Sequence, residues 1–164
     1  MALRQIRTIG DPILEKRSKE VNQLTDRTRE LIEDMIETLY DQNGVGLSAV
    51  QVGVLKRIIV VDVLEEGDRP VVMINPVIRV ADGEQKGFEG CLSVPGKTGM
   101  VTRPNHVIVD YQDENMQHQT LEGEELFARC ICHECDHLEG KLYVNIVEGT
   151  LRDVDGDDTE DEAE

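Results

Sequence analysis

Aromatic side chains are scarce in this sequence, which has no tryptophan, two phenylalanines and three tyrosines among 164 residues. The core must therefore be packed mainly from aliphatic side chains, and a hydrophobic fraction of 39% is compatible with that. There is also no internal repeat and no apolar run long enough to cross a membrane. These absences exclude repeat proteins and helical membrane proteins, and we expect a single domain over residues 1–150.

Basic residues are also few, with 17 lysines and arginines against 34 aspartates and glutamates. Eight of the acids lie in residues 153–164, where there is no base, so residues 1–152 carry a net charge of −9 instead of the −17 of the whole chain. Proteins whose main activity is nucleic acid binding present a basic face. We therefore expect no direct nucleic acid partner, and we predict an acidic, disordered tail over residues 151–164.

The four cysteines do not suit a disulfide framework. Cys130, Cys132 and Cys135 lie on one short segment, far in sequence from Cys91, and cannot supply long-range cross-links. Residues 1–7 also lack the apolar core of a signal peptide. We expect a cytoplasmic protein with reduced thiols.

Hydrophobic periodicity predicts two helices and several strands. Residues 25–42 have helical spacing between a Thr25 or Asp26 N-cap and an Asn43-Gly44 stop, and residues 123–140 form the second helical stretch. Strands are predicted at 56–63, 71–80 and 105–112, after an extended arm over residues 1–24. The pattern indicates an α+β fold, with mixed or antiparallel sheets around a central helix at 123–140 and a second helix in the N-terminal half.

The central helix carries the sequence His133-Glu134-Cys135-Asp136-His137. At about 100° per residue, the two histidines lie one turn apart on the same side, which is the spacing that one divalent metal needs from two imidazoles. They share this side, which we expect to face the core, with Glu134 and with apolar residues that include Leu126 and Cys130. The opposite side of the helix is expected to hold Ala128, Arg129 and Cys132. Unpaired polar groups are costly in a core, and a metal would satisfy them.

A catalytic tetrahedral site needs a third protein ligand and keeps one position for water. Cys91, which lies in the segment 88–96 outside the helix, is the best candidate. Cys130 lies one turn before His133 on the far side from His137, so its short side chain can hardly reach a shared metal. Tyr143 stands where a metzincin would have its third histidine. A metalloprotease of another kind and a non-catalytic zinc module remain as alternatives.

A glycine-rich segment, residues 44–53, allows another backbone or a ligand to approach closely. It lacks the Lys-Ser/Thr pair of a phosphate-binding loop and the spacing of a dinucleotide fingerprint, which excludes nucleotide binding there. Gln51 is its one side chain with both a donor and an acceptor.

Taken together, three segments resemble the motifs of the bacterial peptide deformylases. The resemblance covers residues 3–147, and the motifs appear in order as Gly44-Val45-Gly46-Leu47-Ser48-Ala49-Val50-Gln51, Glu89-Gly90-Cys91-Leu92-Ser93 and His133-Glu134-Cys135-Asp136-His137. It implies one Fe(II) per chain, replaceable by nickel, zinc or cobalt, that is bound by Cys91, His133 and His137. It also implies removal of the formyl group from N-formylmethionyl nascent peptides, with transient proximity to the ribosome.

In the mechanism that the resemblance implies, a metal-bound hydroxide attacks the formyl carbon. Glu134 takes the water proton and passes it to the departing amine. The Gln51 amide and the Leu92 backbone N–H stabilise the negative charge on the oxygen. The Gly46 backbone aligns the peptide as an added strand. Val45, Leu126 and Cys130 are expected to line the pocket for the methionine side chain.

The chain departs from the family pattern at three points. Ser48 stands where the family often has alanine, and Cys132 stands where it often has glutamine. The C-terminal end is acidic, whereas some relatives have a long basic C-terminal helix, so ribosome contact through this end is not expected. Arg103 is expected to pair with Glu89 or Asp136 in a structural role.

Overall fold

The computed structural model describes residues 2–62 and 69–154 and has two α-helices, eight strands and three 3₁₀ helices in these ranges. Their order along the chain is η1 (Pro12–Glu15), α1 (Asp26–Asp41), β1 (Gly46–Ser48), η2 (Ala49–Val52), β2 (Ile58–Val61), β3 (Val71–Asp82), β4 (Gln85–Cys91), β5 (Val94–Arg103), β6 (His106–Gln112), β7 (His118–Glu124), α2 (Leu126–Leu138), η3 (Tyr143–Asn145) and β8 (Glu148–Asp153). None of the described helices is long and apolar enough to span a membrane.

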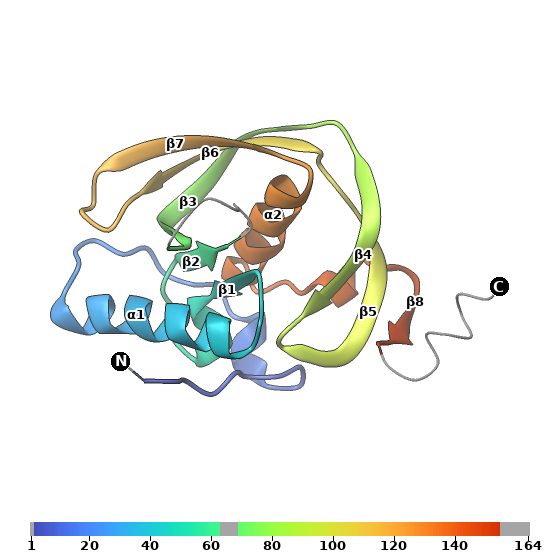
Figure 1. Cartoon of the computed structure of the whole chain (residues 1–164), viewed down its shortest axis with the longest axis horizontal. Helices are drawn as coiled ribbons and strands as arrows, with labels where there is room; N and C mark the ends of the chain where they lie inside the picture. Colours follow the sequence, from blue (N-terminus) through green and yellow to red (C-terminus); the bar gives the residue numbers. More distant parts are fainter. Residues whose placement is uncertain (1, 63–68, 155–164) are drawn as a thin grey trace.

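The strands form two antiparallel sheets. The first has the order β1-β2-β3-β6-β7, and the second has the order β4-β5-β8. Helix α2 lies between the two sheets, and α1 covers the far side of the first sheet (Figure 1). The predicted α+β class and the two helices are confirmed.

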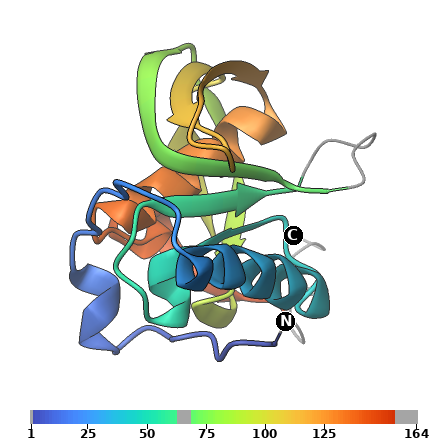
Figure 2. The same ribbon diagram turned by 90° about the vertical axis from the view of Figure 1, so that its left-hand side faces the viewer.

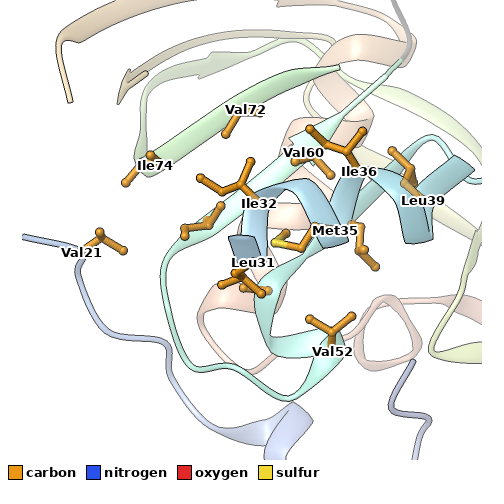
Figure 3. Close-up of a cluster of buried hydrophobic side chains, with 13 residues drawn as sticks. Val21, Leu31, Ile32, Met35, Ile36, Leu39, Val52, Val60, Val72 and Ile74 are labelled. Atoms are coloured by element: carbon orange, nitrogen blue, oxygen red, sulfur yellow. The ribbon is translucent and has the colours of Figure 1, made fainter. Parts of the chain in front are cut away.

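Strand β2 is buried on both faces, which explains its unbroken run of β-branched residues. Ile58 and Val60 pack with α1, whereas Ile59 and Val61 pack with α2, and all four have no exposed surface. Alternate side chains of a strand point to opposite faces, so one strand can contribute to both cores. Figure 3 shows Val60 among the side chains that α1 directs toward the sheet.

Helix α1 begins and ends as its sequence predicts. The Thr25 side chain caps the helix by accepting a hydrogen bond from the Thr28 N–H at 3.2 Å. At the other end Asn43 has a positive φ of 56°, and the Gly44 N–H donates to the Leu39 carbonyl, which closes a Schellman-type stop. The arm that precedes α1, blue in Figure 2, runs along the outside of the molecule.

Helix α2 differs from its predicted face assignment. It starts at Leu126, and Gly123, the first residue of the predicted helix, belongs to β7. The Leu126 side chain is 54% exposed, although it was assigned to the buried face. Ala128, Arg129 and Cys132, which were assigned to the opposite side, are buried. The reason is that sheets cover the helix on two sides, so the helix has no wide solvent-facing stripe.

The three predicted strands correspond to β2, β3 and β6. The other five strands, β1, β4, β5, β7 and β8, were not predicted. Strand β8 crosses the predicted domain boundary between residues 150 and 151 and pairs with β5. The first residues of the predicted tail therefore belong to the second sheet. Residues 155–164, the remainder of that prediction, lie outside the described residues.

Candidate metal centre and active site

The second sheet and α2 bring together the three predicted metal ligands. Cys91 ends β4, and His133 and His137 lie one turn apart on α2. One potential ligand atom from each residue lies within 4.8 Å of the other two, and Cys91 Sγ is 3.4 Å from His137 Nε2. Typical zinc–sulfur and zinc–nitrogen bonds at tetrahedral angles place sulfur and nitrogen about 3.5 Å apart. The cluster therefore fits a tetrahedral metal ion.

The pairing between β4 and β5 is irregular beside Cys91. The register between β4 and β5 shifts between Glu89 and Cys91, and the pairing resumes at Cys91 and Val94. The Cys91 thiol at this end of β4 lies opposite α2, beside His137.

The orientation of His133 is fixed by a buried carboxylate. Glu89 Oε1 lies 2.8 Å from His133 Nδ1, so the other ring nitrogen, Nε2, is directed toward the cluster. Burial lowers the pKa of His133, but its hydrogen bonds with Cys91 and Glu89 outweigh this effect and raise the pKa to about 10. Binding of a cation here must therefore displace a proton from the cluster.

Two arginines hold Glu89 in turn. Arg103 Nε and Nη2 lie 2.8 and 3.0 Å from its carboxylate oxygens, and Arg129 Nη1 lies 2.7 Å from Oε2. Burial opposes the charge, but the bonds from His133 and Arg103 lower the pKa of Glu89 to about 2. Arg103 also donates to Asp136 at 2.7 Å, so the expected pairing of Arg103 is confirmed with both acids.

His137 is fully buried, and this burial together with the charge of His133 holds its pKa well below the ordinary value. A neutral imidazole is the form that binds a metal. His137 Nδ1 has no hydrogen-bond partner within the described part of the chain, whereas Nε2 faces the cysteine. The donor set is thus one cysteine and two imidazoles.

Glu134 lies between α2 and the edge strand β1. Its side chain is buried, and Ser48 Oγ lies 2.8 Å from Oε1. Burial raises the pKa of Glu134 above its usual range, and the positive charge of His133 and the Ser48 hydroxyl oppose this shift. A carboxyl group with a raised pKa next to a metal site is suited to accept and return a proton near neutral pH.

The Gln51 amide is held in one orientation by its neighbours. Its Oε1 accepts a hydrogen bond from the Ser48 N–H at 2.9 Å. Its Nε2 donates to Ser93 Oγ at 3.0 Å and points toward Cys91 Sγ at 3.5 Å. The amide NH₂ group is therefore directed at the metal cluster.

A cavity of about 470 Å³ opens over the cluster. All the residues predicted for substrate contact line it, namely Val45, Gly46, Gln51, Leu92, Leu126 and Cys130, together with Cys91, His133 and Glu134. Val45 and Leu126 are half exposed at its rim, as is Phe88, which the sequence did not indicate. Burial raises the pKa of the Cys130 thiol to about 12, so this thiol is neutral and fits an apolar wall.

Sequence reasoning missed three contributions to the site. Ser48 was noted only as a departure from the family pattern, the link from Glu89 to His133 was not foreseen, and Arg129 was assigned to the other face of the helix. A signal existed for Ser48, because a hydroxyl in a segment of small apolar residues is unusual. For Arg129 the periodicity pointed the wrong way, since only the second sheet makes this side buried.

A family model described as polypeptide deformylase matches residues 3–152. A peptide deformylase of Agathobacter rectalis is 59% identical over 98% of this chain and 100% of its own length, and one of Lachnoclostridium phytofermentans is 54% identical over 99% of both. Two similar solved structures are also peptide deformylases. The enzyme of Legionella pneumophila has 39% identity and a TM-score of 0.86 over 89% of this chain and 86% of its own. The enzyme of Synechococcus elongatus, in complex with actinonin, has 44% identity and a TM-score of 0.84 over 89% and 79%.

Proposed function

This chain belongs to the polypeptide deformylase family, and on that premise we propose that it hydrolyses the formyl group from the N-terminal formyl-methionine of nascent polypeptides in the cytoplasm. The observation that carries the proposal is the placement of Glu134 beside the Cys91, His133 and His137 cluster at the bottom of an open cavity. The four cysteines are all free, in keeping with a reducing compartment.

We propose Fe(II) as the resident metal, one ion per chain, with nickel, zinc or cobalt as substitutes. A thiolate and two imidazoles suit these divalent ions better than magnesium or calcium, which prefer oxygen ligands. When bound, the metal supplies Lewis acidity, which lowers the pKa of water and polarises a carbonyl group. Cys91, His133 and His137 would hold it, and Glu89 would keep the His133 ring in the binding orientation.

The remaining steps fall to the protein's own groups. Glu134 takes a proton from the attacking water as the new C–O bond forms at the formyl carbon. The C–N bond then breaks, Glu134 gives this proton to the departing nitrogen, and the products are formate and a free N-terminal amine. The Gln51 NH₂ group and the Leu92 N–H are the donors for the oxygen that becomes negative.

Substrate orientation follows from the edge of the first sheet. Strand β1 is an edge strand, so the outer backbone groups of Gly46 can pair with an extended peptide. Val45, Leu126 and Cys130 then form the wall beside the methionine side chain. The surplus of acidic residues does not favour contact with RNA, and the partner that we propose is the formylated nascent peptide itself.

An open cavity and a buried general base also argue against the two alternatives. A closed structural zinc site has no use for Glu134. A metalloprotease would use a ligand set without Cys91, and within the described residues Cys91, His133 and His137 form the one group of three with metal-binding geometry.

The test is release of free amine from a formyl-Met tripeptide by protein loaded anaerobically with Fe(II) or with Ni(II). Glu134→Ala and Cys91→Ser should each abolish turnover. The matched controls Glu124→Ala, at an exposed position, and Cys132→Ser, at a buried position that does not line the cavity, should keep it. Actinonin, which the Synechococcus relative binds, should raise the melting temperature of the loaded protein. No turnover by the wild-type protein with one bound equivalent of metal would contradict the proposal.

A further inference from the structure

Strand β1 presents two residues of one face to Glu134. Gly46 and Ser48 are two positions apart and therefore point to the same side of the strand. Leu47 between them points to the opposite side, where it packs in the core under α1. Both residues contact Glu134, so strand β1 helps to determine the position of a side chain that belongs to helix α2.

The first contact is a hydrogen bond from a fully buried hydroxyl. Ser48 Oγ lies 2.8 Å from Glu134 Oε1 and 2.9 Å from the Glu134 backbone carbonyl oxygen. The hydroxyl has one proton and can donate to one of these two acceptors at a time. A bond to the ionised carboxylate is the stronger one, so the carboxylate of Glu134 is the preferred acceptor.

The second contact is the close approach of a backbone. A Cβ atom at Gly46 would lie 2.6 Å from Glu134 Oε2 and 3.0 Å from its Cγ, so the carboxylate rests against the glycine Cα. The last torsion of a glutamate side chain has a broad minimum and does not fix the carboxylate plane by itself. The hydroxyl on one side and the glycine on the other fix it here.

We propose that Ser48 is a positioning residue for the proposed deformylation: it holds Glu134 by Oε1 and leaves Oε2, beside the cavity-lining Gly46, as the oxygen that exchanges the proton. This proposal rests on the function proposed above. Ser48 itself touches neither the substrate nor the metal ligands in this role.

The role of the Ser48 hydroxyl can be tested separately from the role of the Ser48 backbone. The Ser48 backbone N–H, which orients Gln51 at 2.9 Å, is kept by any residue other than proline. Ser48→Ala therefore removes only the two contacts of the hydroxyl with Glu134. Ser18→Ala is the matched control, because Ser18 is also a buried serine but its Oγ has no hydrogen-bond partner within the described residues.

The experiment measures kcat and KM of the metal-loaded protein with a formyl-Met tripeptide, and the crystal structures of both variants. Loss of the hold on a general base should lower kcat about 5- to 20-fold and change KM by less than about 2-fold. The Glu134 carboxylate should be rotated or split between two orientations in Ser48→Ala. The Ser18→Ala variant should match the wild type in all of these measurements.

Three results would overturn the proposal: an unchanged kcat in Ser48→Ala, an increase in KM alone, or a Glu134 carboxylate that stays in place without the hydroxyl. Failure of the proposed function looks different. In that case the wild-type protein does not cleave the formyl peptide at all, and the crystal structure of Ser48→Ala still decides whether the hydroxyl positions the carboxylate.

Discussion

Replacing Glu89 with glutamine removes the negative charge of a buried carboxylate that binds Arg103, Arg129 and His133. Its two oxygens face four donor nitrogens, two from Arg103, one from Arg129 and one from His133, at 2.7 to 3.0 Å. A glutamine amide has one oxygen and one NH₂ group, and the NH₂ group cannot accept. Whichever way the amide turns, two donors lose their acceptor.

The expected cost can be estimated from these bonds. Hydrogen bonds to charged groups contribute about 1.5–3 kcal/mol each, and breaking a buried ion pair on one side costs about 3–5 kcal/mol in total. We expect Glu89→Gln to lower the free energy of unfolding by about 3–5 kcal/mol. Since small domains are stable by about 5–15 kcal/mol, the variant should be close to the limit of folding.

Urea unfolding of the apoprotein, followed by circular dichroism because the chain has no tryptophan, measures this loss. Asp110→Asn is the matched control, because it breaks the solvent-exposed pair between Asp110 and Arg79 and should cost no more than about 1 kcal/mol. Competition with a chelator gives a second measurement. Loss of the acceptor for His133 Nδ1 should weaken metal binding about 10- to 100-fold. A Glu89→Gln variant within about 1 kcal/mol of the wild type, with unchanged metal affinity, would refute the reasoning.

Further predictions concern acid stability, the close approach at Gly46 and a helix cap. The folded-state pKa of Glu89 is about 2 against an ordinary value of 4.5, so its contribution should be complete above about pH 4.5 and be lost as the pH falls toward 2. Urea unfolding between pH 2 and 6 should show this slope, and Glu89→Gln should lack it. Gly46→Ala should reduce kcat more than about 10-fold with an unchanged circular dichroism spectrum, because its Cβ would displace the Glu134 carboxylate. Thr25→Ala should lower the unfolding free energy by about 1 kcal/mol without a change in kcat.

The two helices and the proximity of His133 to His137 could be predicted from sequence because their signals are local. Thr25 and Asn43-Gly44 mark the ends of α1 by side-chain capping and by a left-handed residue, and neither depends on the rest of the fold. His133 and His137 are brought together by the pitch of one helix. Cys91 was predicted because the site needs a third ligand, although it lies on β4 of the second sheet and not on α2.

The second sheet could not be predicted in this way. Strands β4 and β5 contain glycine, lysine and threonine, and they lack the run of β-branched residues that marked β2. Their conformation is fixed by pairing with each other and with β8. Strand β7 was also missed, because it lies at the edge of the first sheet and its side chains are mostly polar.

The supporting contacts of the site also depend on this long-range assembly. The bond from Ser48 to Glu134 joins residues 86 positions apart, and the bond from Glu89 to His133 joins residues 44 positions apart. No pattern within either segment shows which side chain will face which. The face of α2 that holds Arg129 was assigned wrongly for the same reason, since the covering sheet was not foreseen.

The position of Cys91 on β4 has a consequence for the unfolded chain. Cys91 and His137 are 46 positions apart, so a metal bound by both residues closes a loop of that length, as a covalent cross-link would. Closing such a loop costs an unfolded chain roughly 4 kcal/mol of conformational entropy. In the folded protein the sheets and helices already hold the two residues together, so ion binding does not have to close this loop. The folded protein therefore binds the ion far more tightly than the unfolded chain does. A strong chelator should therefore lower the free energy of unfolding of the loaded protein to that of the apoprotein, with no direct effect on its hydrophobic core.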